Sequence, residues 1–253
     1  MQKSFYQAKT PDEALQIYFD GDNELYGQMK NKAIQTVLQE TVFTKKASLR
    51  GAKVLEIGPG GGVWTSYFIR NGASVTCVDM AEQVLKGNQK LHPEAKCILA
   101  NATTVKINEK FDLVFAKDVI EHIEDDIEFL KNMSDHLKPS GMILINTQNN
   151  VCLNYLIQGG YHRLMGNKDW CGWDPTHVRF YNSRSLKTKL AASGFRCMKW
   201  FGNYYFPYRI LAHHLKIPDS IAVFRAIETT GLCYRFPFNK LGWNIGVVAR
   251  KIN

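Results

Sequence analysis

Short apolar runs punctuate the central half of the chain, and segments with helical spacing lie between them. Five runs of four to six residues are bounded by turn residues, which predicts strands at 54–57, 74–78, 97–100, 111–116 and 142–146. Between them, the apolar spacing predicts helices at 64–71, 81–91 and 127–137. Alternating strands and helices predict an α/β fold, in which a doubly wound, mostly parallel sheet carries helices on both faces.

The two ends of the chain add helical caps to this pattern. Residues 1–50 contain apolar clusters at 14–19 and 33–42 with a turn signal at 20–23, which predicts a helical cap. Residues 51–253 form the rest, with a helix at 185–193 and strands at 196–201 and 243–250. Two long intervals, 148–182 and 202–240, are predicted to be inserts over the substrate side, and the second is expected to be helical.

A glycine-dense turn follows the first strand. Glu56, Gly58, Gly60 and Gly62 alternate with other residues just before a helix. Glycines let a ligand lie against the main chain, so a strand-turn-helix of this kind predicts a nucleotide pocket. The dinucleotide pattern requires glycine or alanine where Val63 stands, and this counts against a nicotinamide-dependent oxidoreductase.

Two later strand ends carry polar residues suited to a nucleoside. Asp79 lies 19 residues after Gly60, the spacing at which an acid accepts hydrogen bonds from ribose hydroxyls. Asn101 follows the third strand, where it can face an adenine or serve only as a turn residue.

The acid-x-Gly-x-Gly-x-Gly pattern resembles motif I of the class I S-adenosylmethionine (SAM) methyltransferases, and Leu137–Gly141 resembles their Leu-Lys-Pro-Gly-Gly turn. Residues 118–122, Asp-x-x-Glu-His, resemble a segment of the ubiquinone-biosynthesis O-methyltransferases and of some small-RNA 2′-O-methyltransferases, with Asp118 in place of a glutamate. A His-x-Arg-Phe-Tyr segment at 177–181 is similar to the substrate-side loop of the same group.

The resemblance covers about residues 50–147 and implies a seven-stranded, Rossmann-like methyltransferase sheet with an antiparallel last strand. It implies a SAM site formed by eight residues: Glu56, Gly58, Gly60, Asp79, Met80, Asn101, Ala102 and Lys117. The activity it implies is methyl transfer to a small molecule, most readily on oxygen. Transfer to nitrogen, nicotinamide-dependent oxidation, and a SAM-binding homologue without catalysis are the alternatives.

Methyl transfer to oxygen needs a group that removes a proton from the acceptor. Asp118, Glu121 and His122 are expected to share one face of a first helical turn, with His177 opposite them. These four residues are candidates for a Mg²⁺ or Zn²⁺ site. Alternatively, His122 or His177 acts as a base without metal, assisted by Asp118, or Asp118 only caps a helix and the histidines only shape the pocket.

The charge distribution and the composition restrict the cellular compartment and the classes of partner that we expect. Residues 1–150 carry 17 basic and 19 acidic residues, whereas residues 151–253 carry 15 and 4. The 202–240 insert is rich in aromatic and basic residues, which favours a role as a lid over an aromatic or lipid-tailed acceptor. Peripheral membrane contact through the same residues is an alternative. Nucleic-acid binding is disfavoured, because the insert lacks a continuous run of basic residues. No apolar run is long enough to span a bilayer and no two of the six cysteines form a C-x-x-C pair, so a cytoplasmic protein with reduced thiols is expected.

Overall fold

The computed structural model describes residues 24–43, 49–167, 170, 174, 176–203 and 230–252. The predicted apolar cluster at 14–19 and most of the predicted 202–240 insert lie outside these residues. Within the described residues, no helix is long and apolar enough to cross a membrane.

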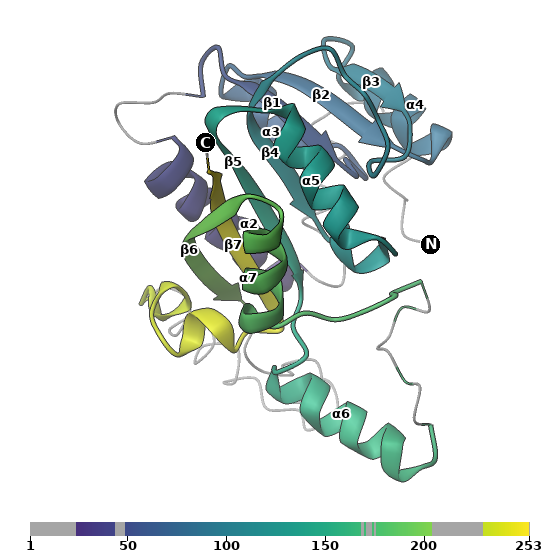
Figure 1. The fold of residues 1–253 in the computed structure, drawn as a ribbon, viewed down its shortest axis with the longest axis vertical. Helices are drawn as coiled ribbons and strands as arrows, with labels where there is room; N and C mark the ends of the chain where they lie inside the picture. The colour runs from purple at the N-terminus through teal and green to yellow at the C-terminus, as the bar shows by residue number, and fades with distance from the viewer. Residues whose placement is uncertain are drawn as a thin grey trace.

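One seven-stranded sheet forms the centre of the molecule (Figure 1). Its strands are β1 (Lys53–Ile57), β2 (Ser74–Asp79), β3 (Lys96–Leu99), β4 (Phe111–Lys117), β5 (Leu137–Gln148), β6 (Phe195–Asn203) and β7 (Asn244–Lys251). Their order is β3-β2-β1-β4-β5-β7-β6, and β7 runs antiparallel between β5 and β6. The predicted α/β class, seven strands and antiparallel last strand are therefore confirmed.

Helices cover both faces of the sheet. They are α2 (Glu24–Val37), α3 (Val63–Arg70), α4 (Glu82–Leu91), α5 (Asp126–His136) and α7 (Ser183–Ala192), whereas a further helix, α6 (Leu153–Leu164), does not lie on the sheet (Figure 1). Because side chains alternate along a strand, Leu55 and Ile57 of β1 join a core with α5 and α7, whereas Val54 joins one with α2, α3 and α4. The apolar residues of the expected 33–42 segment are buried in the second core, where a π-helix, Leu38–Val42, follows α2.

Two local expectations were wrong, and one helix was not predicted. The stretch Leu137–Gly141, expected to be a turn, is the irregular beginning of β5, where Leu137 pairs with Phe111 before a shift in register. Helix α6 was not predicted, and it extends away from the sheet (Figure 1). After β4 the chain forms a 3-10 helix, Ile120–His122, that excludes Asp118.

Candidate active site

A pocket of about 270 Å³ lies at the carboxyl ends of β1, β2 and β4. Five of the predicted SAM-binding residues line it, namely Gly58, Asp79, Met80, Asn101 and Ala102. Asp118 and His122, which were predicted on chemical grounds, line it as well. Gly58 has a φ of 67°, and a Cβ there would come within 2.7 Å of the Val119 side chain, so only glycine fits this edge of the pocket.

The pocket suits a nucleoside. Asp79 Oδ1 accepts from the Ala81 amide at 2.8 Å, which fixes the carboxylate at the pocket wall. Asn101 Oδ1 accepts from the Thr103 amide at 2.8 Å, so this residue also serves as the turn residue considered above. Apolar side chains of Ile57 and Val78 complete the lining, as an adenine ring requires.

Glu56, Gly60 and Lys117 are not among the lining residues of this pocket. Glu56 points from β1 into the core beneath α3, where it is 2% exposed. Its Oε2 accepts a hydrogen bond from the Thr65 hydroxyl at 2.6 Å. Burial raises the pKa of Glu56 to about 8, although hydrogen bonds from Thr65 and Cys77 oppose this shift.

Asp118 stands apart from the other three predicted metal ligands. Its φ of 55° is unusual for a residue with a side chain, and it directly follows β4 without belonging to the next helix. Its carboxylate lies between Lys117 Nζ at 3.0 Å and Asn244 Nδ2 at 3.4 Å. The expectation that residues 118, 121 and 122 share a helical face was therefore wrong, and so was the helix cap at Asp118, since Asp125 caps α5.

Glu121, His122 and His177 do come together. One ligand atom from each lies within 4.8 Å of those of the other two, and the histidine rings are 4.7 Å apart. Glu121 is held by the Thr147 hydroxyl, which donates to its Oε2 at 2.7 Å. Burial, reinforced by the neighbouring His122, lowers the pKa of His177, so this imidazole is neutral at pH 7. A carboxylate and two imidazoles are a donor set that Zn²⁺ accepts.

The hydrogen bonds around His122 fix its tautomer. Its Nδ1 lies 3.3 Å from the Thr176 carbonyl, which can only accept, and 3.0 Å from the Thr176 hydroxyl. That hydroxyl donates its own hydrogen to Asp174 Oδ1 at 2.6 Å. Nδ1 of His122 must therefore carry a proton, so in the neutral ring Nε2 holds the lone pair that can accept a proton or bind a metal.

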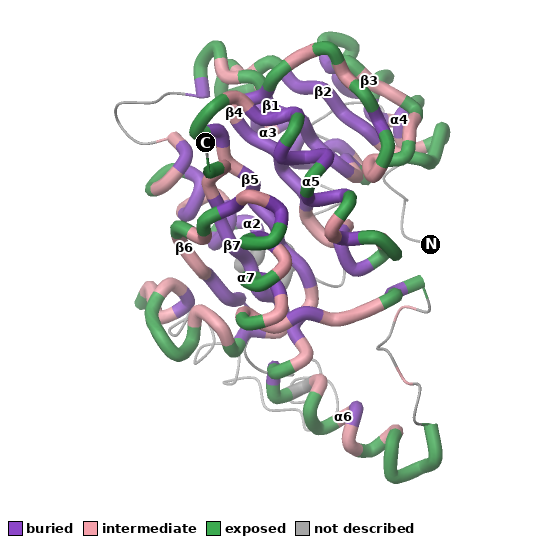
Figure 2. The backbone as a smooth tube through the Cα atoms, in the orientation of Figure 1, coloured by how far each residue is buried: buried purple, intermediate pink, exposed green. Residues whose placement is uncertain are grey.

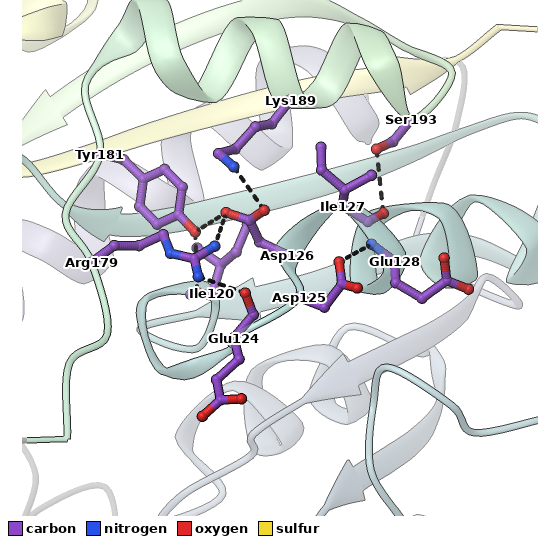
Figure 3. Close-up of polar contacts among 10 residues, drawn as sticks. All are labelled: Ile120, Glu124, Asp125, Asp126, Ile127, Glu128, Arg179, Tyr181, Lys189 and Ser193. Atoms are coloured by element: carbon purple, nitrogen blue, oxygen red, sulfur yellow. Dashed lines mark hydrogen bonds and ion pairs between the residues drawn. The ribbon is translucent and has the colours of Figure 1, made fainter.

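A buried carboxylate joins the two segments that carry these histidines (Figure 3). Asp126, the first residue of α5, is 2% exposed. Its Oδ2 accepts from the Tyr181 hydroxyl at 2.7 Å and from Arg179 at 2.6 Å, while Oδ1 accepts from Lys189 at 2.8 Å. Burial raises the pKa of Asp126, but these bonds outweigh burial and hold the pKa below its usual value.

The backbone makes the same connection. The Val178 amide donates to the Glu121 carbonyl at 2.8 Å, directly beside His177. The segment from Thr176 to Tyr181 is thus fixed against the 3-10 helix. Asp126 and Thr176 received no role from the sequence, because Asp126 contacts Arg179 and Thr176 contacts His122 across 53 and 54 residues, and no spacing rule connects such pairs.

Comparison with known proteins gives one consistent result. A family model described as a methyltransferase domain matches residues 27–199. The "Ubiquinone biosynthesis O-methyltransferase" of Parvibaculum lavamentivorans is 30% identical over 165 residues, which cover 61% of this chain and 63% of that protein. The mitochondrial protein of that name from Schizosaccharomyces pombe is 30% identical over 146 residues, covering 55% and 53%. The chain thus spans between half and two thirds of these relatives.

A solved structure shares the fold. Magnesium protoporphyrin IX methyltransferase from Synechocystis PCC 6803, determined with bound S-adenosylhomocysteine (SAH), aligns over 89% of this chain and 87% of its own. The TM-score is 0.58 at 13% identity, so the likeness concerns the fold. The family model covers well over half of the chain, and the sheet has the matching topology. The chain therefore belongs to the methyltransferase domain family, within the class I SAM-dependent methyltransferases.

Proposed function

We propose that the protein transfers a methyl group from SAM to an oxygen atom of a small molecule. The observation that carries this proposal is the position of His122, which lines the nucleoside pocket and whose Nδ1 is bonded to Thr176, so that Nε2 is the nitrogen left to accept a proton. SAM supplies a methyl group on a cationic sulfur, which is already activated for displacement. The protein has to align the acceptor, exclude water and accept the hydroxyl proton.

Each residue has a task in this proposal. Asp79 holds the ribose hydroxyls, Asn101 and Ala102 flank the adenine with Met80, and Gly58 lets the nucleoside approach the main chain. His122 Nε2 accepts the acceptor proton, and the bond from Nδ1 to Thr176 holds the ring in the required tautomer. His177, neutral and adjacent, and Asp118, at the pocket edge, line the acceptor side.

The clustering of Glu121, His122 and His177 favours a second candidate for proton removal. A divalent cation held by these three residues would acidify the acceptor hydroxyl, and the Thr147 hydroxyl would orient Glu121. This metal site omits Asp118. Exhaustive chelation separates the two candidates: turnover that survives supports His122 as the base, and turnover restored only by Mg²⁺ or Zn²⁺ supports the metal.

The names of the two relatives favour an acceptor in the chemistry of ubiquinone precursors, namely a phenol with an apolar tail. Helix α6 suits such a lipid-associated acceptor. Its exposed apolar side chains share one face with helical spacing, at Leu153, Leu156, Ile157, Tyr161 and Leu164. We therefore propose that any peripheral membrane contact is made through α6. Its polar side and the basic final 103 residues would suit an anionic surface.

Calorimetry tests the cofactor assignment. We expect SAM and SAH to bind and NADH not to bind. Gly58→Ala should weaken SAM binding at least about tenfold, because a Cβ meets Val119 and the left-handed backbone is strained. Gly51→Ala is the matched control, since Gly51 is also left-handed but has open space around it. NADH binding, or equal SAM affinity in both variants, would contradict the assignment.

Activity is tested with labelled SAM and a panel of phenols and amines. We expect label on phenolic oxygen and a loss of at least about a hundredfold in kcat for His122→Gln. Label on nitrogen would identify the alternative acceptor class. SAM binding without transfer to any acceptor would identify a non-catalytic homologue.

A further inference from the structure

Four amide side chains gather at one end of the sheet beside the cofactor pocket. Asn146 and Gln148 belong to the end of β5, Asn203 ends β6, and Asn244 begins β7. Gln148 pairs with Asn244, and Asn244 pairs with Asn203, so these three form one line across three strands. Asn146 precedes Gln148 by two residues and therefore points to the same face. We call these four residues the amide row.

Several polar atoms of the amide row are buried and have no hydrogen-bond partner among the described residues. They are both amide atoms of Asn146, both of Asn203, and Oε1 of Gln148. Asn146 and Asn203 are 0% exposed. An unsatisfied buried amide destabilises a protein, and native structures rarely keep one without a reason. Two fully buried unsatisfied asparagines within one row indicate groups that a ligand satisfies.

The amide row adjoins the proposed reaction centre through Asp118. Asn244 Nδ2 donates to Asp118 Oδ1 at 3.4 Å, and the Asp118 amide donates to the Asn146 carbonyl at 2.8 Å. Asp118 also lines the nucleoside pocket. A molecule that contacts the row can therefore also reach the end of β4, where His122 stands.

We propose that the amide row is the polar subsite for the methyl acceptor and that it recognises neutral hydroxyl groups on a ring. A carboxamide offers both an N–H donor and an oxygen acceptor, and a neutral hydroxyl offers the same pair. The row itself carries no positive charge, so an ionised carboxylate would lack a charged partner there. An acceptor with two adjacent hydroxyls, as in a catechol, satisfies one amide with the hydroxyl that is not methylated. This inference rests on the proposed methyl transfer.

Stability of the ligand-free protein gives the first test. Asn146→Leu and Asn203→Leu remove unsatisfied amides with little change in volume, so each variant should keep or raise the Tm. Asn149→Leu is the matched control, because its equally buried Nδ2 donates to the Lys240 and Gly242 carbonyls at 2.9 and 2.8 Å. It should lower the Tm by several degrees. A similar fall for Asn146→Leu and Asn203→Leu would show that their amides have structural partners and would overturn the subsite.

Binding of catechol gives the second test, and it needs no turnover. With SAH present, calorimetry should show catechol binding to the wild type and at least about tenfold weaker binding to Asn146→Leu and Asn203→Leu, while SAH affinity stays constant. Equal catechol affinity in all three proteins, or none in the wild type, would overturn the subsite. If binding behaves as expected but no methyl group is transferred, the subsite stands and the proposed function fails.

Discussion

At the scale of single residues, the motif and the structure suggest different roles for the Glu56 side chain. The motif places a carboxylate near the charged end of SAM, whereas the side chain turns into the core and bonds to Thr65. Alternation along β1 explains this, because Glu56 shares a face with Val54 and not with Ile57. We propose that Glu56 supports the glycine turn from beneath.

The raised pKa of Glu56 predicts a pH-dependent stability. Because the folded protein binds this proton more tightly than the unfolded chain, the free energy of unfolding falls as pH rises from the ordinary glutamate value to about 8. Above that pH the contribution is constant. Glu56→Gln should remove this dependence, so chemical denaturation should find the variant more stable, relative to wild type, at pH 8.5 than at pH 5. If the free energy of unfolding differed between variant and wild type by the same amount at both pH values, the Glu56 carboxyl of the folded protein would already be ionised at pH 5.

Positions at strand ends could be predicted, and contacts between distant segments could not. Asp79 and Asn101 line the pocket because the carboxyl ends of parallel strands meet at one edge, which follows from the alternating pattern alone. Asp118 was assigned to a helix because nothing in its sequence signals a φ of 55°. The bond from His122 to Thr176 spans 54 residues and depends on how a loop docks.

At the scale of elements, the docked segment from Thr176 to Tyr181 determines where His177 lies. Asp126 holds it through Arg179 and Tyr181, and holds α7 through Lys189. A buried ion pair adds little net stability compared with apolar packing. We therefore expect Asp126 to act mainly as a positioning residue for His177, through the loop.

Two substitutions separate positioning from stability. Tyr181→Phe releases the loop side of Asp126, so we expect kcat to fall by about tenfold and hydrogen exchange of the Val178 amide to accelerate, with SAM affinity unchanged. Lys189→Met, the control, removes a bond only from the α7 side. It should lower the Tm while leaving kcat and Val178 exchange near wild type. If hydrogen exchange of the Val178 amide accelerates equally in both variants, Asp126 stabilises the loop and α7 together and does not specifically position the loop.

The sequence predicted the regular elements much better than the inserts. Strands and helices from β1 to α5 have period-2 or period-3.6 patterns that fix their type. Helix α6 was missed because its apolar residues are exposed and its two consecutive glycines, Gly159 and Gly160, lower its helix propensity.

At the scale of the whole molecule, α6 forms an extension below the sheet, and its surface is mostly exposed (Figure 2). Leu164 at its end is 88% exposed and Ile157 is 57% exposed. The basic excess of the chain also lies entirely after residue 150. A lipid surface would cover this apolar face and attract this charge at the same time.

Vesicle flotation tests that arrangement. We expect binding to vesicles with anionic phosphatidylglycerol, weaker binding to neutral phosphatidylcholine, and a loss of at least about tenfold for the double variant Leu156→Ser and Ile157→Ser. Ile252→Ser is the control, because Ile252 is 55% exposed and directly follows β7, and the C mark at the end of the chain lies away from α6 in Figure 1. Equal flotation of the double variant and the control would exclude α6 as the contact.

Because of the strand order, donor binding and acceptor recognition depend on two different parts of the chain. The nucleoside pocket uses only residues 57–123, whereas His177, its loop and three of the four amides follow residue 147. A chimera that keeps the first portion and takes its later portion from another family member should therefore retain the methyl donor and change the acceptor. Exchanging the carboxyl-terminal portion is thus the route by which substrate choice in this protein could be redesigned, or could have diverged, without disturbing the cofactor.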